Sequence, residues 1–133
     1  VVAEVEVAEK IWLRRAFAAV DAGGVINPDG LKNQVEGGIV QAASWTLKEA
    51  VRWDTRRVLT RSWEDYPILR FDETPALEVV VLDQPGSPGL GAGECAAGPT
   101  AAAIANALHH ALGVRARDLP LTPERVAQAM ESS

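Results

Sequence analysis

The sequence predicts an α+β fold: a small mixed sheet with one long helix, one alanine-rich helix and a short C-terminal helix. Three observations lead to this prediction. Apolar and polar residues alternate with a period of two in residues 1–20, as in half-buried strands. Apolar residues then recur at helical spacing in residues 31–50 and again in residues 99–112. A chain of 133 residues with 47% apolar content can bury one core, so we expect a single domain.

An antiparallel hairpin is expected at the N-terminus. Residues 1–7 alternate glutamates with small apolar residues, and a second run covers about residues 11–20. The segment from Asp21 to Gly24 then ends the second strand. Strict alternation divides that strand between two faces, with Ile11, Leu13, Phe17 and Ala19 on one and Trp12, Ala16 and Val20 on the other.

A long helix is predicted over about residues 31–50, directly after the turn signal Asn27-Pro28-Asp29-Gly30. Two glycines, Gly37 and Gly38, lie inside it, where each costs about 1 kcal/mol relative to alanine. The pair therefore indicates a close approach to the helix, either by another helix or strand or by a bound ligand. The apolar stripe of this helix consists of Leu31, Val35, Ile39, Ala42 and Thr46.

Residues 51–83 are interpreted as strands and irregular segments. Strands are expected at about residues 51–54, 58–63 and 79–82, with Pro67 and Pro75 interrupting the region.

Two helices are predicted in the last third of the chain. The alanine-rich helix covers residues 99–112, with Pro99 in its first turn and Gly113 at its end. Thr122 is a favourable N-cap for a short helix over residues 124–130, and Pro123 suits the first turn.

Composition excludes several classes of function. The formal net charge is −5 and no basic block could bind a run of phosphates, so no nucleic acid partner is expected. No segment approaches the roughly 20 consecutive apolar residues of a membrane span, and the N-terminus does not resemble a signal peptide. We expect a soluble protein and leave its compartment open between cytoplasm and periplasm. Val1 in place of an initiator methionine indicates a piece of something longer.

The most promising candidate site is a glycine-rich loop from Gly86 to Gly93. Four glycines and two prolines in residues 85–93 favour a loop with accessible backbone amides. Because a helix follows a few residues later, such a loop could hold an anion or bring main-chain atoms against a flat ligand. It matches neither the dinucleotide-binding fingerprint nor the phosphate-binding loop of nucleotide hydrolases.

Glu94, at the end of this loop, is the candidate catalytic residue. It is the one acidic residue between Asp83 and Asp118, and glycine, cysteine and alanines flank it. A carboxyl group in apolar surroundings can exchange protons near neutral pH, as general acid/base catalysis requires. The alternative is a structural glutamate that caps the following helix or pairs with an arginine.

Gln34, near the start of the long helix, could bind the polar edge of a ligand through its amide donor and acceptor. The alternatives are a solvated helix residue, or a capping box from Asn33 to Glu36 that needs no ligand.

No set of side chains predicts a protein-bound metal or a covalent nucleophile. His109 and His110 are adjacent on a helix and point about 100° apart, which suits a shared metal poorly. Cys95 is interpreted as a small buried thiol. The four tryptophans are interpreted as core anchors or as contacts at an interface with further chain: Trp12, Trp45, Trp53 and Trp63.

Several short motifs occur along the chain in a specific order. They are Val20-Asp21-Ala22-Gly23, Ile26-Asn27-Pro28, Gln34 to Gly38, Asp65-Tyr66-Pro67, Gly91-Ala92-Gly93-Glu94, Ala103-Ile104-Ala105-Asn106-Ala107 and Leu119-Pro120-Leu121-Thr122-Pro123. Together they resemble the C-terminal end of the molybdopterin-binding large subunit of the xanthine dehydrogenase and aldehyde oxidase family. The chain is most similar to the branch of the isoquinoline 1-oxidoreductase beta subunit and the nicotinate dehydrogenase large subunit.

This resemblance implies roles for particular residues. Glu94 matches the family's catalytic glutamate, the general base that prepares a water-derived oxygen for attack on an electron-poor carbon. Gln34 matches a glutamine that contacts the pterin, and Gly91, Ala92 and Gly93 match the loop beside the metal. The implied cofactor is molybdenum-molybdopterin, expected in its cytosine dinucleotide form. Its dithiolene holds the molybdenum, so no protein metal ligand is expected.

The resemblance also implies partners. The family's large subunit is several times longer, so residues 1–133 correspond to a C-terminal segment of a molybdopterin-binding domain. We expect the remaining molybdopterin-binding chain, a small subunit with iron–sulfur clusters, and a small-molecule substrate, an N-heteroaromatic compound or an aldehyde. The isolated chain is expected to be inactive. The competing hypothesis is a non-catalytic interaction or scaffold domain that retains the fold.

Overall fold

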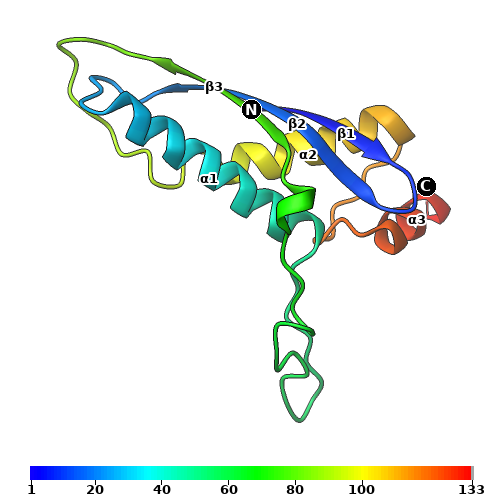
Figure 1. Cartoon of the computed structure of the whole chain (residues 1–133). Helices are drawn as coiled ribbons and strands as arrows, with labels where there is room; N and C mark the ends of the chain where they lie inside the picture. Colours follow the sequence, from blue (N-terminus) through cyan, green and yellow to red (C-terminus); the bar gives the residue numbers. More distant parts are fainter. Residues whose placement is uncertain (133) are drawn as a thin grey trace.

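The computed structural model describes residues 1–132 and contains one three-stranded sheet with helices packed against it (Figure 1). The elements in chain order are β1 (Val2–Val7), β2 (Ile11–Asp21), α1 (Pro28–Leu47), the 3-10 helix η1 (Phe71–Glu73), β3 (Ala76–Leu82), α2 (Ala97–Leu112) and α3 (Pro123–Glu131).

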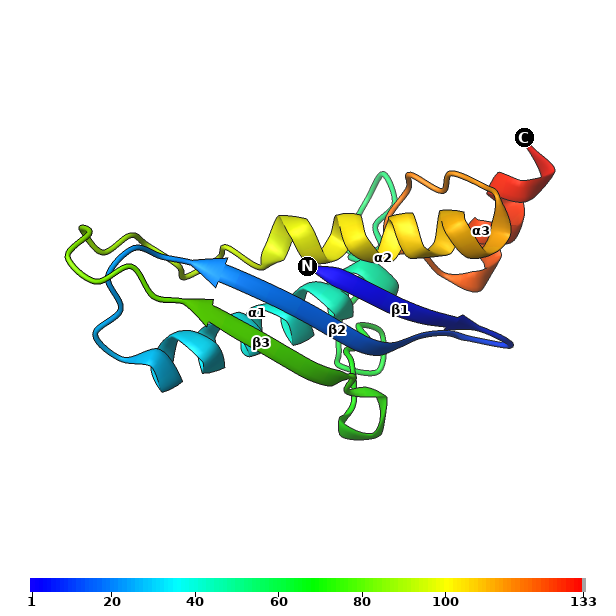
Figure 2. The same ribbon diagram turned by 90° about the horizontal axis from the view of Figure 1, so that it is seen from above.

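The sheet is mixed, as the sequence predicts. Its strand order is β1-β2-β3; β1 pairs with β2 in antiparallel orientation, and β2 pairs with β3 in parallel. Helices α1 and α2 lie side by side on one face of the sheet, and the other face carries no helix (Figures 1 and 2). Within residues 1–132, no helix has both the length and the apolar character needed to cross a membrane.

A β-bulge in β2 corrects the predicted division of this strand into two faces. Glu4 pairs with Arg15 whereas the next residue, Val5, pairs with Leu13, so the register shifts by one residue at this point. A bulge reverses the inward and outward alternation beyond it. Phe17 consequently lies on the open face of the sheet and is 38% exposed, although strict alternation grouped it with Leu13. The residues of β2 that enter the core are Leu13, Ala16, Ala18 and Val20.

Helix α1 confirms the predicted apolar stripe but begins and ends earlier than expected. Asn27 is the N-cap, and its side-chain oxygen accepts a 2.9 Å hydrogen bond from the Gly30 amide; Pro28 occupies the first turn. Since the helix begins at Pro28, Asn33 cannot be an N-cap, and the alternative interpretation of Asn33 to Glu36 as a capping box is wrong. The stripe residues that are fully buried are Val35, Ile39, Ala42 and Thr46.

The two C-terminal helices begin and end within two residues of the predicted positions. Gly113 ends α2 in the left-handed conformation, with φ of 74°. Thr122 caps α3 by accepting a 3.4 Å hydrogen bond from the amide of Arg125. Ile104 and Leu108 of α2, Leu121 of the connection and Val126 of α3 join the core formed by the sheet and α1.

Residues 49–70 form a projecting arm that leaves the body after α1 and returns before η1 (Figure 1). The strands expected at 51–54 and 58–63 do not form, and one antiparallel bridge, between Trp53 and Val58, takes their place. A two-stranded segment with no surface to pack against cannot bury its apolar side chains. Trp53 and Trp63 are accordingly 71% and 77% exposed, so they are not core anchors of this chain. The strand expected at 79–82 is confirmed and begins earlier, as β3.

Candidate functional site

Residues 83–90, which lead into the glycine-rich loop and form its first part, are bonded to the loop that connects β2 to α1. The amide of Gln84 donates to the Gly23 carbonyl at 3.2 Å, and the amide of Leu90 donates to the Ala22 carbonyl at 2.8 Å. The Asp83 side chain accepts a further 3.1 Å bond from the amide of Val25. We refer to residues 21–25 as the clasp.

Gly23 makes this contact possible because its backbone leaves no room for a side chain. Its φ is +71°, and a Cβ atom there would lie 2.1 Å from the carbonyl oxygen of Pro88. From sequence alone, the motif Asp21-Ala22-Gly23-Gly24 predicts only the end of a strand. The consecutive glycines were the available signal for a close backbone approach, but their partner loop is some 60 residues further along the chain.

At its second half the loop is attached to helix α1. The side-chain nitrogen Nε2 of Gln34 donates a 2.7 Å hydrogen bond to the carbonyl oxygen of Gly93, the residue before Glu94. The structure therefore brings Gln34 to the loop and to Glu94, which lie about 60 positions later in the sequence.

The junction between the loop and α2 also packs against α1. The Glu94 carbonyl accepts a 3.1 Å hydrogen bond from the amide of Ala97 at the start of α2. A Cβ added to Gly38 would lie 3.2 Å from the Cβ of Ala96, so this glycine permits close packing of the helices. Of the two interpretations offered for the glycine pair, close helix packing is confirmed at Gly38. At Gly37 a Cβ would meet nothing within 4 Å, so packing within this chain gives no reason for that glycine.

Neither structural interpretation of the Glu94 side chain is supported. The N-cap of α2 is Ala96, and no side chain caps this helix. Among the salt bridges of residues 1–132, none involves Glu94. The side chain is exposed, so the apolar enclosure expected for a general base is not supplied by this chain itself.

The surface beside Glu94 is nearly bare backbone. A Cβ added at Gly91, Gly93 or Gly98 would meet nothing within 4 Å, and the same is true of Gly37 on α1. Ala92 is half-buried and contributes only a methyl group. A surface of this kind lets a flat molecule with many polar edges approach main-chain amides and carbonyls directly.

Groups with shifted pKa values lie away from this loop. Burial alone would raise the pKa of the Glu73 carboxyl, but the hydrogen bonds from Lys48 and the Arg70 amide, with the charges of Lys48 and Lys10, hold it below its ordinary value. The hydrogen bond from Tyr66 to Glu49 raises the pKa of the Tyr66 hydroxyl. These groups stabilise the base of the arm and do not mark the candidate site.

Other candidate residues do not converge on the loop. In the described part of the chain, no group of three histidine, cysteine, aspartate or glutamate side chains is placed to hold a metal ion. His109 and His110 lie in the last turn of α2, whereas Glu94 precedes the first turn of this helix. The two histidines are therefore at the opposite end of α2 from Glu94. Cys95 is exposed, which corrects its interpretation as a buried thiol.

The chain is similar to proteins that bind molybdopterin. Residues 1–75 match the family model of the molybdopterin cofactor-binding domain. A nicotinate dehydrogenase subunit of Pseudomonas putida is 42% identical over 91% of this chain, and the isoquinoline 1-oxidoreductase beta subunit of Brevundimonas diminuta is 37% identical over 82%. The matched region spans 10% of the first relative and 14% of the second.

Solved structures agree with the sequence relatives. Quinoline 2-oxidoreductase from Pseudomonas putida 86 has a TM-score of 0.81 and 31% identity over 91% of this chain and 16% of its own. A Cu,Mo-CO dehydrogenase has a TM-score of 0.79 and 25% identity over 93% of this chain and 17% of its own. On this basis, the chain belongs to the molybdopterin cofactor-binding domain family found in the large subunits of xanthine dehydrogenase and aldehyde oxidase enzymes.

Proposed function

We propose that this chain forms part of a molybdenum hydroxylase that oxidises N-heteroaromatic compounds or aldehydes with water-derived oxygen. Glu94 is its general base. The observation that carries the proposal is the placement of an exposed carboxylate, without a salt bridge in the described chain, at the end of a loop attached to the body on both sides. A base must be free to accept a proton and must also be held in a defined position.

The residues present fit a molybdopterin, for which we propose the cytosine dinucleotide form. A Cβ at Gly91 or Gly93 would meet nothing within 4 Å, and Ala92 between them adds only a methyl group, so this stretch leaves room for a ligand against the main chain. Gln34 uses one N–H to bind Gly93, and its second N–H and its carbonyl oxygen remain for a ligand. The bound cofactor would supply the molybdenum that accepts the electrons removed from the substrate. Glu94 would take up the proton released in that oxidation at its carboxylate.

The proposed partners follow from how little of its relatives this chain spans. The matched region is 10% of the nicotinate dehydrogenase relative, and the surface beside Glu94 is open. We propose that the remaining molybdopterin-binding chain encloses the substrate and the other side of the cofactor. Iron–sulfur clusters on a small partner subunit would carry the electrons away. The chain alone would then be inactive.

Glu94→Gln in the assembled enzyme tests the proposal. Loss of a general base is expected to reduce turnover by a factor of about 10² to 10⁴, whereas molybdenum and pterin content should stay at the level of the unmodified enzyme. Glu78→Gln, which changes an exposed glutamate on β3, is the matched control and should leave turnover unchanged. Retained turnover in Glu94→Gln would contradict the role of Glu94.

A scaffold domain that binds only a protein partner is the second candidate, and the exposed arm at residues 49–70 is the observation in its favour. Metal analysis separates the two. The hydroxylase proposal expects close to one molybdenum per chain in the assembled complex, whereas a scaffold would contain none.

A further inference from the structure

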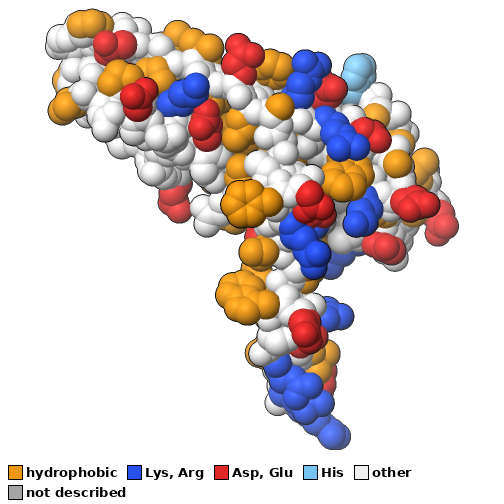
Figure 3. Space-filling view, in the orientation of Figure 1, with side chains coloured by type: hydrophobic (Ala, Val, Ile, Leu, Met, Phe, Trp, Pro, Cys, Tyr) orange, Lys and Arg blue, Asp and Glu red, His pale blue; other side chains and the backbone are white. Residues whose placement is uncertain are grey.

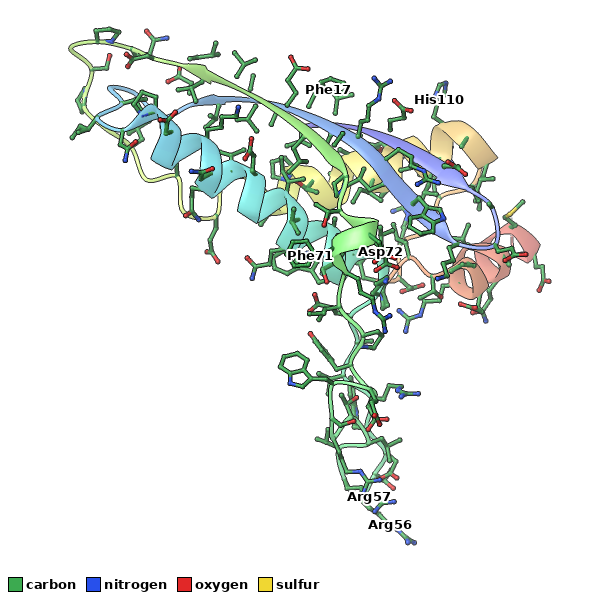
Figure 4. The ribbon with its side chains drawn as sticks, in the orientation of Figure 1. Phe17, Arg56, Arg57, Phe71, Asp72 and His110 are labelled. Atoms are coloured by element: carbon green, nitrogen blue, oxygen red, sulfur yellow. The ribbon has the colours of Figure 1, made fainter. Side chains whose placement is uncertain are left out.

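The arm at residues 49–70 exposes apolar side chains along its length. In addition to the two tryptophans, its exposed large apolar residues are Val51, Val58, Leu59 and Ile68. Phe71 of η1, at the root of the arm, is also fully exposed (Figure 4). A concentration of exposed large apolar side chains on one short segment is a feature of interaction sites.

The arm nevertheless has a defined conformation. At its tip, the Asp54 carboxylate accepts hydrogen bonds from the amides of Arg56 at 2.7 Å and Arg57 at 2.9 Å. At its root, the Tyr66 hydroxyl donates to Glu49 at 2.7 Å. The amide of Leu69 also donates to the Ser44 hydroxyl of α1 at 2.9 Å. Polar contacts of this kind hold the arm, which leaves its tryptophans available and lowers the entropy lost when a partner binds.

The tip of the arm is basic although the chain as a whole is acidic. Residues 51–61 contain four arginines and one aspartate, whereas the net charge of the chain is −5. Arg56 and Arg57 point away from the body at the far end (Figure 4), and basic side chains cover the tip in the space-filling view (Figure 3). The other arginines of this segment are Arg52 and Arg61.

We propose that the arm is a docking element. Its partner is the part of the molybdopterin-binding polypeptide that lies outside residues 1–133, whether joined to this chain or separate from it. The partner surface would offer apolar pockets for Trp53 and Trp63 and acidic side chains around them for the arginines.

Two observations select this occupant. The solved neighbours contain the fold as 16–17% of a much longer chain, so most of the surface able to cover the arm belongs to that same polypeptide. The arm also combines tryptophan with arginine and contains no lysine. Protein interfaces favour tryptophan and arginine over lysine, whereas attraction to a membrane surface or to phosphates uses both basic residues.

This proposal rests on the proposed assembly with the remaining molybdopterin-binding chain, but it does not depend on the catalytic role of Glu94. The arm leaves α1 after Leu47, whereas Gln34 contacts the glycine loop near the other end of the same helix. At 1.5 Å per residue, the two positions are about 20 Å apart along the helix. The two proposals can therefore fail separately. If changes at the arm tip leave docking unchanged, Glu94 can still be the base, and if Glu94 is not the base, the arm can still dock.

Photo-crosslinking in the assembled enzyme tests the docking proposal, with p-benzoylphenylalanine in place of Trp63. We expect cross-linked peptides from the molybdopterin-binding polypeptide outside residues 1–133. Cross-links only to the iron–sulfur subunit, to a second copy of residues 1–133 or to lipid would overturn the proposal, as would no cross-link at all.

A charge reversal at the tip supplies the second measurement. Arg56→Glu with Arg57→Glu should lower the cross-link yield about tenfold, equivalent to about 1.4 kcal/mol of docking free energy. Arg117→Glu is the matched control, since it changes an arginine outside the arm, and it should leave the yield unchanged. An unchanged yield in the double variant would contradict the arm's role, and circular dichroism checks that both variants fold.

Discussion

The side-chain amide of Gln34 is bonded to the carbonyl of Gly93 at 2.7 Å, which ties the long helix to the residue before Glu94. On its other side the loop is bonded to the clasp, through the amides of Gln84 and Leu90. The position of Glu94 therefore depends on two attachments that lie far upstream in sequence. This arrangement gives Gln34 a positioning role within the chain, in addition to the cofactor contact proposed for it.

Removal of the Gln34 amide should loosen the loop. In Gln34→Ala, we expect faster hydrogen exchange at the amides of Leu90 and Ala97, which flank Gly93. Loss of one hydrogen bond worth about 1 kcal/mol corresponds to roughly fivefold faster exchange. Gln41→Ala changes an exposed glutamine on the same helix and serves as the control. Equal exchange rates in the two variants would show that Gln34 does not hold the loop.

A side chain at Gly23 should separate the clasp from the glycine loop. Gly23→Ala combines a positive φ with a clash at the Pro88 carbonyl, so we expect a loss of about 2–3 kcal/mol in the free energy of unfolding. Gly86→Ala is the control: its φ is +85°, but a Cβ there meets open space, and we expect a loss of about 1 kcal/mol. Urea titrations of both variants measure the difference, and similar losses would argue against the clasp.

The two glycines of α1 should respond differently to alanine. Gly37→Ala is expected to raise the free energy of unfolding by about 1 kcal/mol, because alanine favours a helix and meets no neighbour there. Gly38→Ala should be at least about 0.5 kcal/mol less stable than Gly37→Ala, because its methyl group crowds Ala96. Chemical unfolding of the isolated chain compares them. A more stable Gly38→Ala would mean that the helices can move apart at no cost.

The ion pair between Lys48 and Glu73 should make stability depend on pH. The Glu73 side chain is 8% exposed and its pKa lies below the ordinary value of 4.5. A lowered folded-state pKa stabilises the protein above pH 4.5, and this contribution is lost as the pH falls through the folded-state value. Glu73→Gln should therefore cost about 2 kcal/mol at pH 7 and progressively less below pH 4.5.

Unfolding free energies between pH 3 and pH 7 measure this effect. Glu9→Gln, which changes an exposed glutamate in the turn between β1 and β2, is the control, and its unfolding free energy at pH 7 should stay close to that of the unmodified chain. A constant difference between Glu73→Gln and the unmodified chain across this range would contradict the ion pair's contribution.

The helices were largely predictable because their signals are local. Thr122 caps α3 and Gly113 ends α2 through bonds to residues within one or two turns, so sequence spacing carries the information. The face occupied by Phe17 was not predictable in this way. It depends on the bulge between β1 and β2, which is a property of the pairing of two strands rather than of either strand alone.

The conformation of the arm was not predictable from the sequence, for a similar reason. Strands are predicted at residues 51–54 and 58–63, which contain Trp53 and Trp63, and in the structure these side chains have no sheet or helix to cover them. Whether such a segment becomes a strand depends on a neighbouring surface, which residues 1–132 do not provide.

For the site, residue types and the ordered resemblance of the motifs were enough to establish which groups are available: a glycine-rich loop, one carboxylate at Glu94 and an amide at Gln34. The folded chain was needed to establish that Gln34 bonds to Gly93, that Gly23 closes the clasp, and that Glu94 is exposed without a salt bridge in the described chain. The cause is chain topology: the parallel pairing of β2 with β3 places the loops after both strands at one end of the sheet. That end meets the first turns of α1 and α2, and no local sequence pattern encodes a contact across some 60 residues.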